Sequence, residues 1–175
     1  MLTIAALLMA AATAASPSSS ALVSTASWWE KVTVTVSGDG KPQSCKYESS
    51  LRASDPASCD VEGGSLGASG SGSKEEFTRI TFERRFIPGG QLPGESSLQL
   101  GDTLLGRHVM ALAIDPSGSV QGCKVVASSG DMTPDYGCEE VQAEKFEASA
   151  AKAAASPPRQ GYMTVLVYGH AEHLA

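Results

Sequence analysis

Apolar and polar residues alternate with a period of two along several stretches of this chain. The clearest case is 32–37, where three valines alternate with Thr33, Thr35 and Ser37. Such alternation is typical of a strand with one buried face and one solvated face. On this ground, and from the turn signals at 38–40 and 115–118 that imply returning strands, the sequence predicts six strands, at 32–37, 43–48, 77–86, 108–114, 120–127 and 161–169.

One stretch favours a helix, from Tyr136 to Lys145, because Asp135 can serve as its N-cap and Val141 lies on the same helix face as Cys138. The element order is then β-β-loop-β followed by β-β-α-β. We therefore predict an α+β fold built from two similar hairpin units. The second unit is complete, and the helix of the first is reduced.

Each predicted hairpin unit carries one pair of cysteines at nearly the same spacing. Cys45 and Cys59 belong to the first unit, and Cys123 and Cys138 to the second. Four cysteines allow three pairings. Pairing within each unit is the favoured one, because each pair recurs at the same place in its unit. None of the four has the C-x-x-C spacing of a redox site or zinc ribbon, so we expect structural disulfides without metal.

The N-terminal sequence predicts export. An apolar run is followed by Ala12-Thr13-Ala14, which fits the small-residue pattern of a signal-peptidase site. Disulfides also persist in oxidising compartments, so we expect a periplasmic location. The predicted organisation is a signal peptide at 1–15, a flexible leader at 16–27, a first unit at 28–88 with a Gly/Ser loop at 62–73, a connector at 89–99, a second unit at 100–170 and a tail at 171–175.

Composition and motifs favour a binding protein over an enzyme. The 175-residue chain has a net charge of -6, so its composition lacks the positive charge that is typical of nucleic-acid binding. Its histidines, at 108, 170 and 173, form no H-E-x-x-H motif, and no G-x-S-x-G or phosphate-binding loop is present. We therefore expect no catalytic, cofactor or metal site, and we read Arg84-Arg85 as an exposed pair.

The second unit resembles the C-terminal domain of TonB-family energy transducers. The resemblance covers roughly 100–170 and rests on the run IDPSGSVQGCKVVASSG at 114–130, followed by Asp135, Cys138 and Phe146. Some branches of that family carry a cysteine pair joining the second strand to the helix. The family's membrane anchor and Pro-rich spacer are not expected here, and its F-x-P-A is replaced by Phe146-Glu147-Ala148-Ser149. The resemblance thus implies the fold more directly than it implies energy transduction.

The resemblance implies protein binding by addition of a strand to an exposed sheet edge. The candidate edge is the last strand, with the alternative that this strand is central and forms core; its residues are Tyr162, Met163, Thr164, Val165, Leu166, Val167 and Tyr168. We expect the partner to be a periplasmic or outer-membrane protein, with a link to TonB-dependent outer-membrane transport. The alternatives are a secreted structural or inhibitor-like protein and, third, a small hydrolase.

Overall fold

The computed structural model describes residues 24–39, 41–51, 77–95, 98–149 and 156–172. They form six strands and one helix. The elements are β1 (Trp28–Val36), β2 (Pro42–Ser49), β3 (Arg79–Pro88), β4 (Asp102–Ile114), β5 (Val120–Gly130), α1 (Cys138–Ala143) and β6 (Arg159–His170). All six predicted strands are therefore present.

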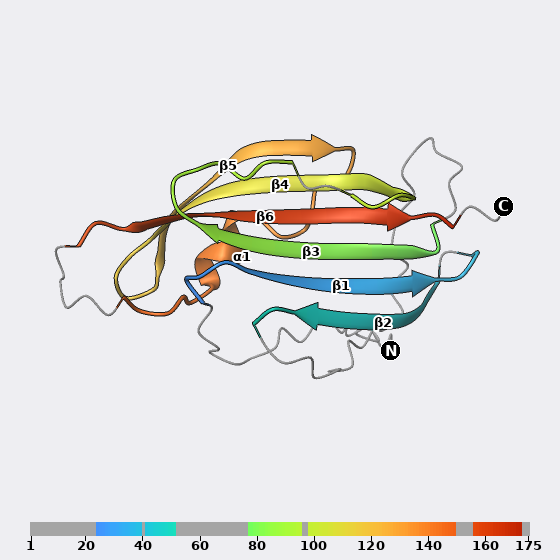
Figure 1. Ribbon diagram of the computed structural model, residues 1–175, viewed down its shortest axis with the longest axis horizontal. Coiled ribbons are helices and arrows are strands. Elements are labelled where there is room, and N and C mark those ends of the chain that lie inside the picture. The colour runs from blue at the N-terminus through green and yellow to red at the C-terminus, as the bar shows by residue number, and fades with distance from the viewer. Residues whose placement is uncertain (1–23, 40, 52–76, 96–97, 150–155, 173–175) are drawn as a thin grey trace, which may run out of the picture.

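The six strands form one antiparallel sheet in the order β2-β1-β3-β6-β4-β5 (Figure 1). Counted from its outer edge, each half of the sheet has the same arrangement: the second strand of that half, then its first, then its third. An outer strand pairs with the first strand of its half, and the third strand of each half meets the other at the centre. β3 and β6 join the halves through a continuous register from Arg79↔His170 to Pro88↔Gly161.

The hydrophobic core lies between the sheet and α1. Strand residues of alternate positions point to this face, as the period-two pattern predicts. The Phe86 ring packs at a tilt against the Phe146 ring, with centroids 5.0 Å apart, and both side chains are fully buried. The buried cluster consists of Trp28, Phe86, Met110, Leu112, Ile114, Val141, Phe146, Met163 and Val165.

The predicted α+β class is wrong. α1 has six residues, whereas each strand has between eight and thirteen, so the molecule is predominantly an antiparallel sheet. The helix is also shorter than the predicted 136–145 and begins after Gly137 instead of Asp135. It ends early because Phe146 must enter the core, where its amide donates a hydrogen bond to the Gly118 carbonyl at 2.8 Å.

Several predictions fall outside the described residues. These are the signal peptide at 1–15, most of the leader, the Gly/Ser loop at 62–73, and Cys59. Within the part of the chain that the structure describes, no helix is long and apolar enough to span a membrane.

Candidate functional site

The predicted partner-binding strand lies at the centre of the sheet. β6, which contains Tyr162–Tyr168, pairs with β3 on one side and with β4 on the other. Its main-chain groups are therefore used on both sides, and the side chains from Met163 to Val167 are all buried. The prediction that this strand is an edge is wrong, and the alternative, a central strand, is what the structure has. Any strand addition must use one of the two outer strands.

The β2 edge carries features that discourage pairing with another chain. β2 begins with a proline, Pro42, which lacks an amide donor. Lys46 and Lys31 both contact Glu48, at 3.1 and 3.2 Å. The pKa of the Glu48 carboxyl is lowered overall. The hydrogen bond from Lys46 contributes most, burial opposes it by raising the pKa, and Lys31 lowers it further. Proline and charge are the usual means by which sheet edges avoid pairing with other chains.

The β5 edge lacks these features. Its eleven residues contain no proline and one charged side chain, Lys124. Val125 and Val126 are 41% and 43% exposed, so this edge presents two neighbouring apolar side chains. Val109 pairs with Ala127 and Met110 with Val125, so Val126 is the extra residue of a β-bulge. A second register shift, between Ala113 and Ile114, leaves Gln121 unpaired in the same way. The regular part of β5 is therefore 122–125, between the two irregularities.

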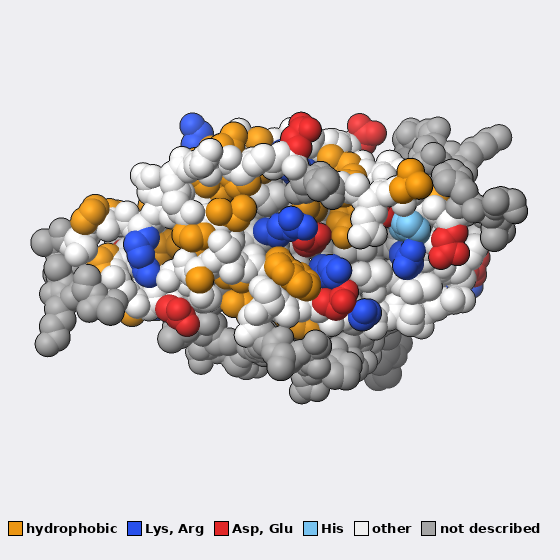
Figure 2. Space-filling model, viewed as in Figure 1, with side chains coloured by type: hydrophobic (Ala, Val, Ile, Leu, Met, Phe, Trp, Pro, Cys, Tyr) orange, Lys and Arg blue, Asp and Glu red, His pale blue; other side chains and the backbone are white. Residues whose placement is uncertain are grey.

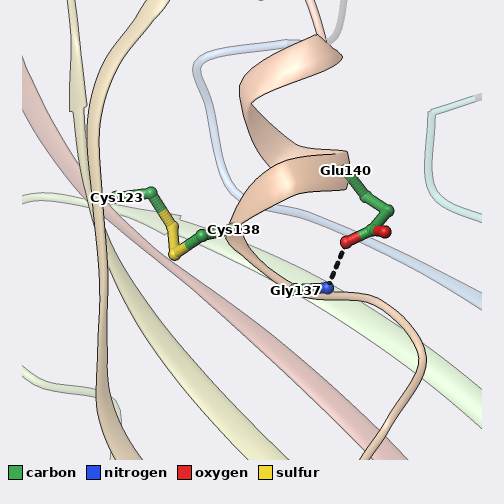
Figure 3. The surroundings of a disulfide bond; sticks show 4 residues. All are labelled: Cys123, Gly137, Cys138 and Glu140. Carbon is green, nitrogen blue, oxygen red and sulfur yellow. Dashed lines mark hydrogen bonds between the residues drawn. A yellow bond between two sulfur atoms is a disulfide. The ribbon is translucent and has the colours of Figure 1, made fainter.

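A disulfide attaches this regular part of β5 to α1 (Figure 3). Cys123 on β5 bonds to Cys138, the first residue of α1, which confirms the predicted pairing in the second unit. The helix start is further fixed by Glu140, whose carboxylate accepts a hydrogen bond from the Gly137 amide at 2.8 Å. Cys45 is also disulfide-bonded, and its predicted partner Cys59 lies outside the described residues. β5 is thus held in place from one side, while no described strand pairs with its outer edge.

The turn between β4 and β5 is fixed as well. Asp115 accepts hydrogen bonds from the Ser117 hydroxyl at 2.6 Å and the Ser119 amide at 2.9 Å. The Ser117 hydroxyl contributes most to lowering the pKa of Asp115, and the Ser119 amide adds to it. Gly118 has φ +89°, and a Cβ at this position would lie 1.9 Å from the Phe146 carbonyl oxygen. The position therefore requires glycine both for its backbone conformation and for the close approach of the chain after α1.

Arg84, predicted to be exposed, instead joins β3 to α1. Its guanidinium contacts Glu30 on β1 at 2.6 Å and Glu144 at the end of the helix, and lies 4.8 Å from the centre of the Tyr136 ring. Burial lowers the pKa of Arg84, but the attraction of Glu144 and Glu30 outweighs it and raises that pKa overall. The two arginines are adjacent in a strand and therefore point to opposite faces, so only Arg85 lies on the face away from the helix.

The face of the sheet opposite α1 carries charges of both signs, interspersed across the surface (Figure 2). Many of these charges are paired. Arg85 contacts Glu83, and Arg79 lies 3.9 Å from Glu172. Burial, followed by the nearby Glu83 carboxylate, raises the pKa of Tyr168 to about 12. Among the described residues of this face, charges of opposite sign therefore largely neutralise one another.

His170 has a clear structural partner. Its Nδ1 lies 2.8 Å from Oδ1 of Asp102. This pair joins the end of β6 to the start of β4. Among the residues that the structure describes, no three His, Cys, Asp or Glu side chains are grouped in a way that could hold a metal ion.

No family model, curated protein or solved structure matches this chain. The resemblance to TonB C-terminal domains therefore stays a prediction. The functional argument rests on the geometry of the sheet and its two edges.

Proposed function

We propose that this protein is an exported protein-binding module that takes up an extended segment of its partner as an added strand on β5. The observation that supports this most strongly is the asymmetry of the two sheet edges. β2 carries Pro42 and a paired charge cluster, whereas β5 offers a proline-free strand with exposed valines. An open, regular edge can supply main-chain hydrogen bonds to a peptide.

The Cys123–Cys138 disulfide supports the same proposal in two ways. It holds β5 in its paired conformation before a partner arrives, which reduces the ordering cost of binding. It also favours an oxidising compartment, in agreement with the proposed export to the periplasm. The partner class that follows from this location is a periplasmic or outer-membrane protein. A link to TonB-dependent outer-membrane transport rests on the sequence resemblance and is part of the proposal.

A displayed library of short random peptides tests the proposal on the oxidised full chain. We expect the protein to enrich peptides that bind in an extended conformation. The double variant V125K/V126K places two like charges at the open edge and should reduce capture by roughly tenfold or more. The matched double variant Q43K/S44K makes the same change on β2 and should capture peptides as the unmodified protein does. Equal loss in both variants, or no capture by the unmodified protein, would reject strand addition at β5.

A further inference from the structure

A shallow hollow lies beside the regular part of β5, on the face of the sheet opposite α1. Its volume is about 400 Å³, which is within the range of small-ligand sites. The cross-strand register brings its lining residues together on three neighbouring strands: Ala111, Ala113, Gly122, Lys124, Gln160 and Tyr162. The hollow therefore reaches from the centre of the sheet to the edge at which we propose the partner binds.

The hollow exists because small residues face one another across β4 and β5. Ala113 pairs with Gly122, so neither strand fills the space above this point. A Cβ added at Gly122 would contact the Ala113 Cβ at 3.5 Å, an ordinary van der Waals distance, and would otherwise meet open space. The floor is consequently apolar, and no described residue covers it. Tyr162, whose hydroxyl lies 3.4 Å from the Gly90 carbonyl, forms the far wall.

Lys124 stands at the rim of the hollow, two residues along β5 on the same face. Its side chain is exposed, and among the described residues it takes part in none of the ion pairs. This distinguishes it from the lysines on β1 and β2, which are paired with Glu48. An acidic side chain opposite Lys124 would therefore gain a charge partner without displacing an existing one.

We infer that the peptide accepted by β5 carries a large apolar or aromatic residue that covers Gly122 and, two positions away, an acidic residue that pairs with Lys124. The inference rests on the proposed function, because it requires a strand added to β5. In an added strand, residues two positions apart share a face and lie opposite Gly122 and Lys124 in either strand direction. An aromatic side chain across from an edge glycine covers the exposed backbone, as in designed sheets.

Two substitutions separate this inference from strand addition itself. G122V fills the hollow with a residue that favours strands, so the edge stays regular while its recognition surface is lost. K124E reverses the charge at the rim. Each variant is checked for cooperative unfolding before use, and each is tested against the same displayed peptide library as the unmodified protein.

We expect the unmodified protein to enrich peptides in which a large apolar or aromatic residue and an acidic residue are separated by one position. G122V should still capture extended peptides but lose the aromatic preference by roughly fivefold or more, and K124E should exchange the acidic preference for a basic one. Capture that is lost in V125K/V126K but shows no such motif, or a motif unchanged in G122V, would overturn this inference and leave strand addition standing. No capture at all, or a dimer in sedimentation that V125K/V126K abolishes, would overturn both.

Discussion

The two outer strands of this sheet occupy equivalent positions but have opposite surface properties. Both belong to hairpins, and both carry a disulfide-bonded cysteine opposite a core residue, Cys45 across from Val34 and Cys123 across from Leu112. β2 adds proline and paired charges, whereas β5 adds exposed valines and an uncovered hollow. The two halves therefore share a topology but differ in edge chemistry, and on our proposal only the β5 half binds a partner.

The largest effect is expected at the two hairpin turns. G118A places a Cβ in a left-handed conformation and against the Phe146 carbonyl, whereas Gly38 has nothing within 4 Å of its Cβ position and no positive φ. We expect G118A to lower the free energy of unfolding by about 3 kcal/mol and G38A to change it by less than about 1 kcal/mol. Urea unfolding of the two variants measures the difference. Similar losses in both would show that the β4–β5 turn is no more constrained than its counterpart.

An effect of similar size is expected at the two cysteine pairs. Removing the Cys123–Cys138 bond with C123A/C138A frees a segment with a sequence separation of 15 and should cost about 3 kcal/mol of unfolding free energy in the chain-entropy model. The corresponding C45A/C59A variant should lose a similar amount, since the predicted loop has nearly the same length. Peptide capture should distinguish the two variants: C123A/C138A should lose more capture than C45A/C59A, because only Cys123 lies on the β5 edge. Equal loss of capture in the two variants would remove the proposed difference between the edges.

The smallest expected effect is a lowered carboxyl pKa that the two hairpin turns share. Asp39 and Asp115 sit in the two hairpin turns, and hydrogen bonds from Ser37 and Ser117, respectively, contribute most to lowering each pKa. A lowered carboxyl pKa means that the stabilisation is present above the unfolded-state pKa of about 3.9 and is lost as pH falls through the folded value. Carbon-13 NMR titration should therefore find both carboxyls mostly ionised at pH 3.8, the ordinary pKa of an aspartate. Titration of Asp115 alone at its ordinary pKa would contradict the turn geometry.

The strands could be predicted from the sequence because their signal is local. Alternation along 32–37 and 77–86 places residues on two faces wherever the strand lies in the sheet. Strand boundaries are harder to predict from the sequence. β4 begins at Asp102, six residues before the predicted start, because its first residues pair with the end of β6. The helix was overpredicted because nothing local shows that Phe146 must turn back to Gly118.

The candidate site could be predicted only in part. Strand addition followed from the resemblance, and the Cys123–Cys138 bond followed from the repeat. The position of the edge did not, because the order of strands depends on contacts between residues far apart in the chain, such as Arg84↔Val165. Val125 and Val126 were recognised as strand residues, but an exposed valine and a buried one have the same sequence signal.

The most direct test of the account is an NMR map of the oxidised, isotope-labelled full chain bound to a peptide selected from the displayed library. The account predicts new protection of β5 amides from exchange, together with cross-strand nuclear Overhauser contacts between the peptide and residues from Val120 to Val125. The amides of β2 should be unchanged. Protection on β2, or peptide contacts confined to the charged face around Arg79 and Glu83, would contradict the proposal that β5 is the binding edge.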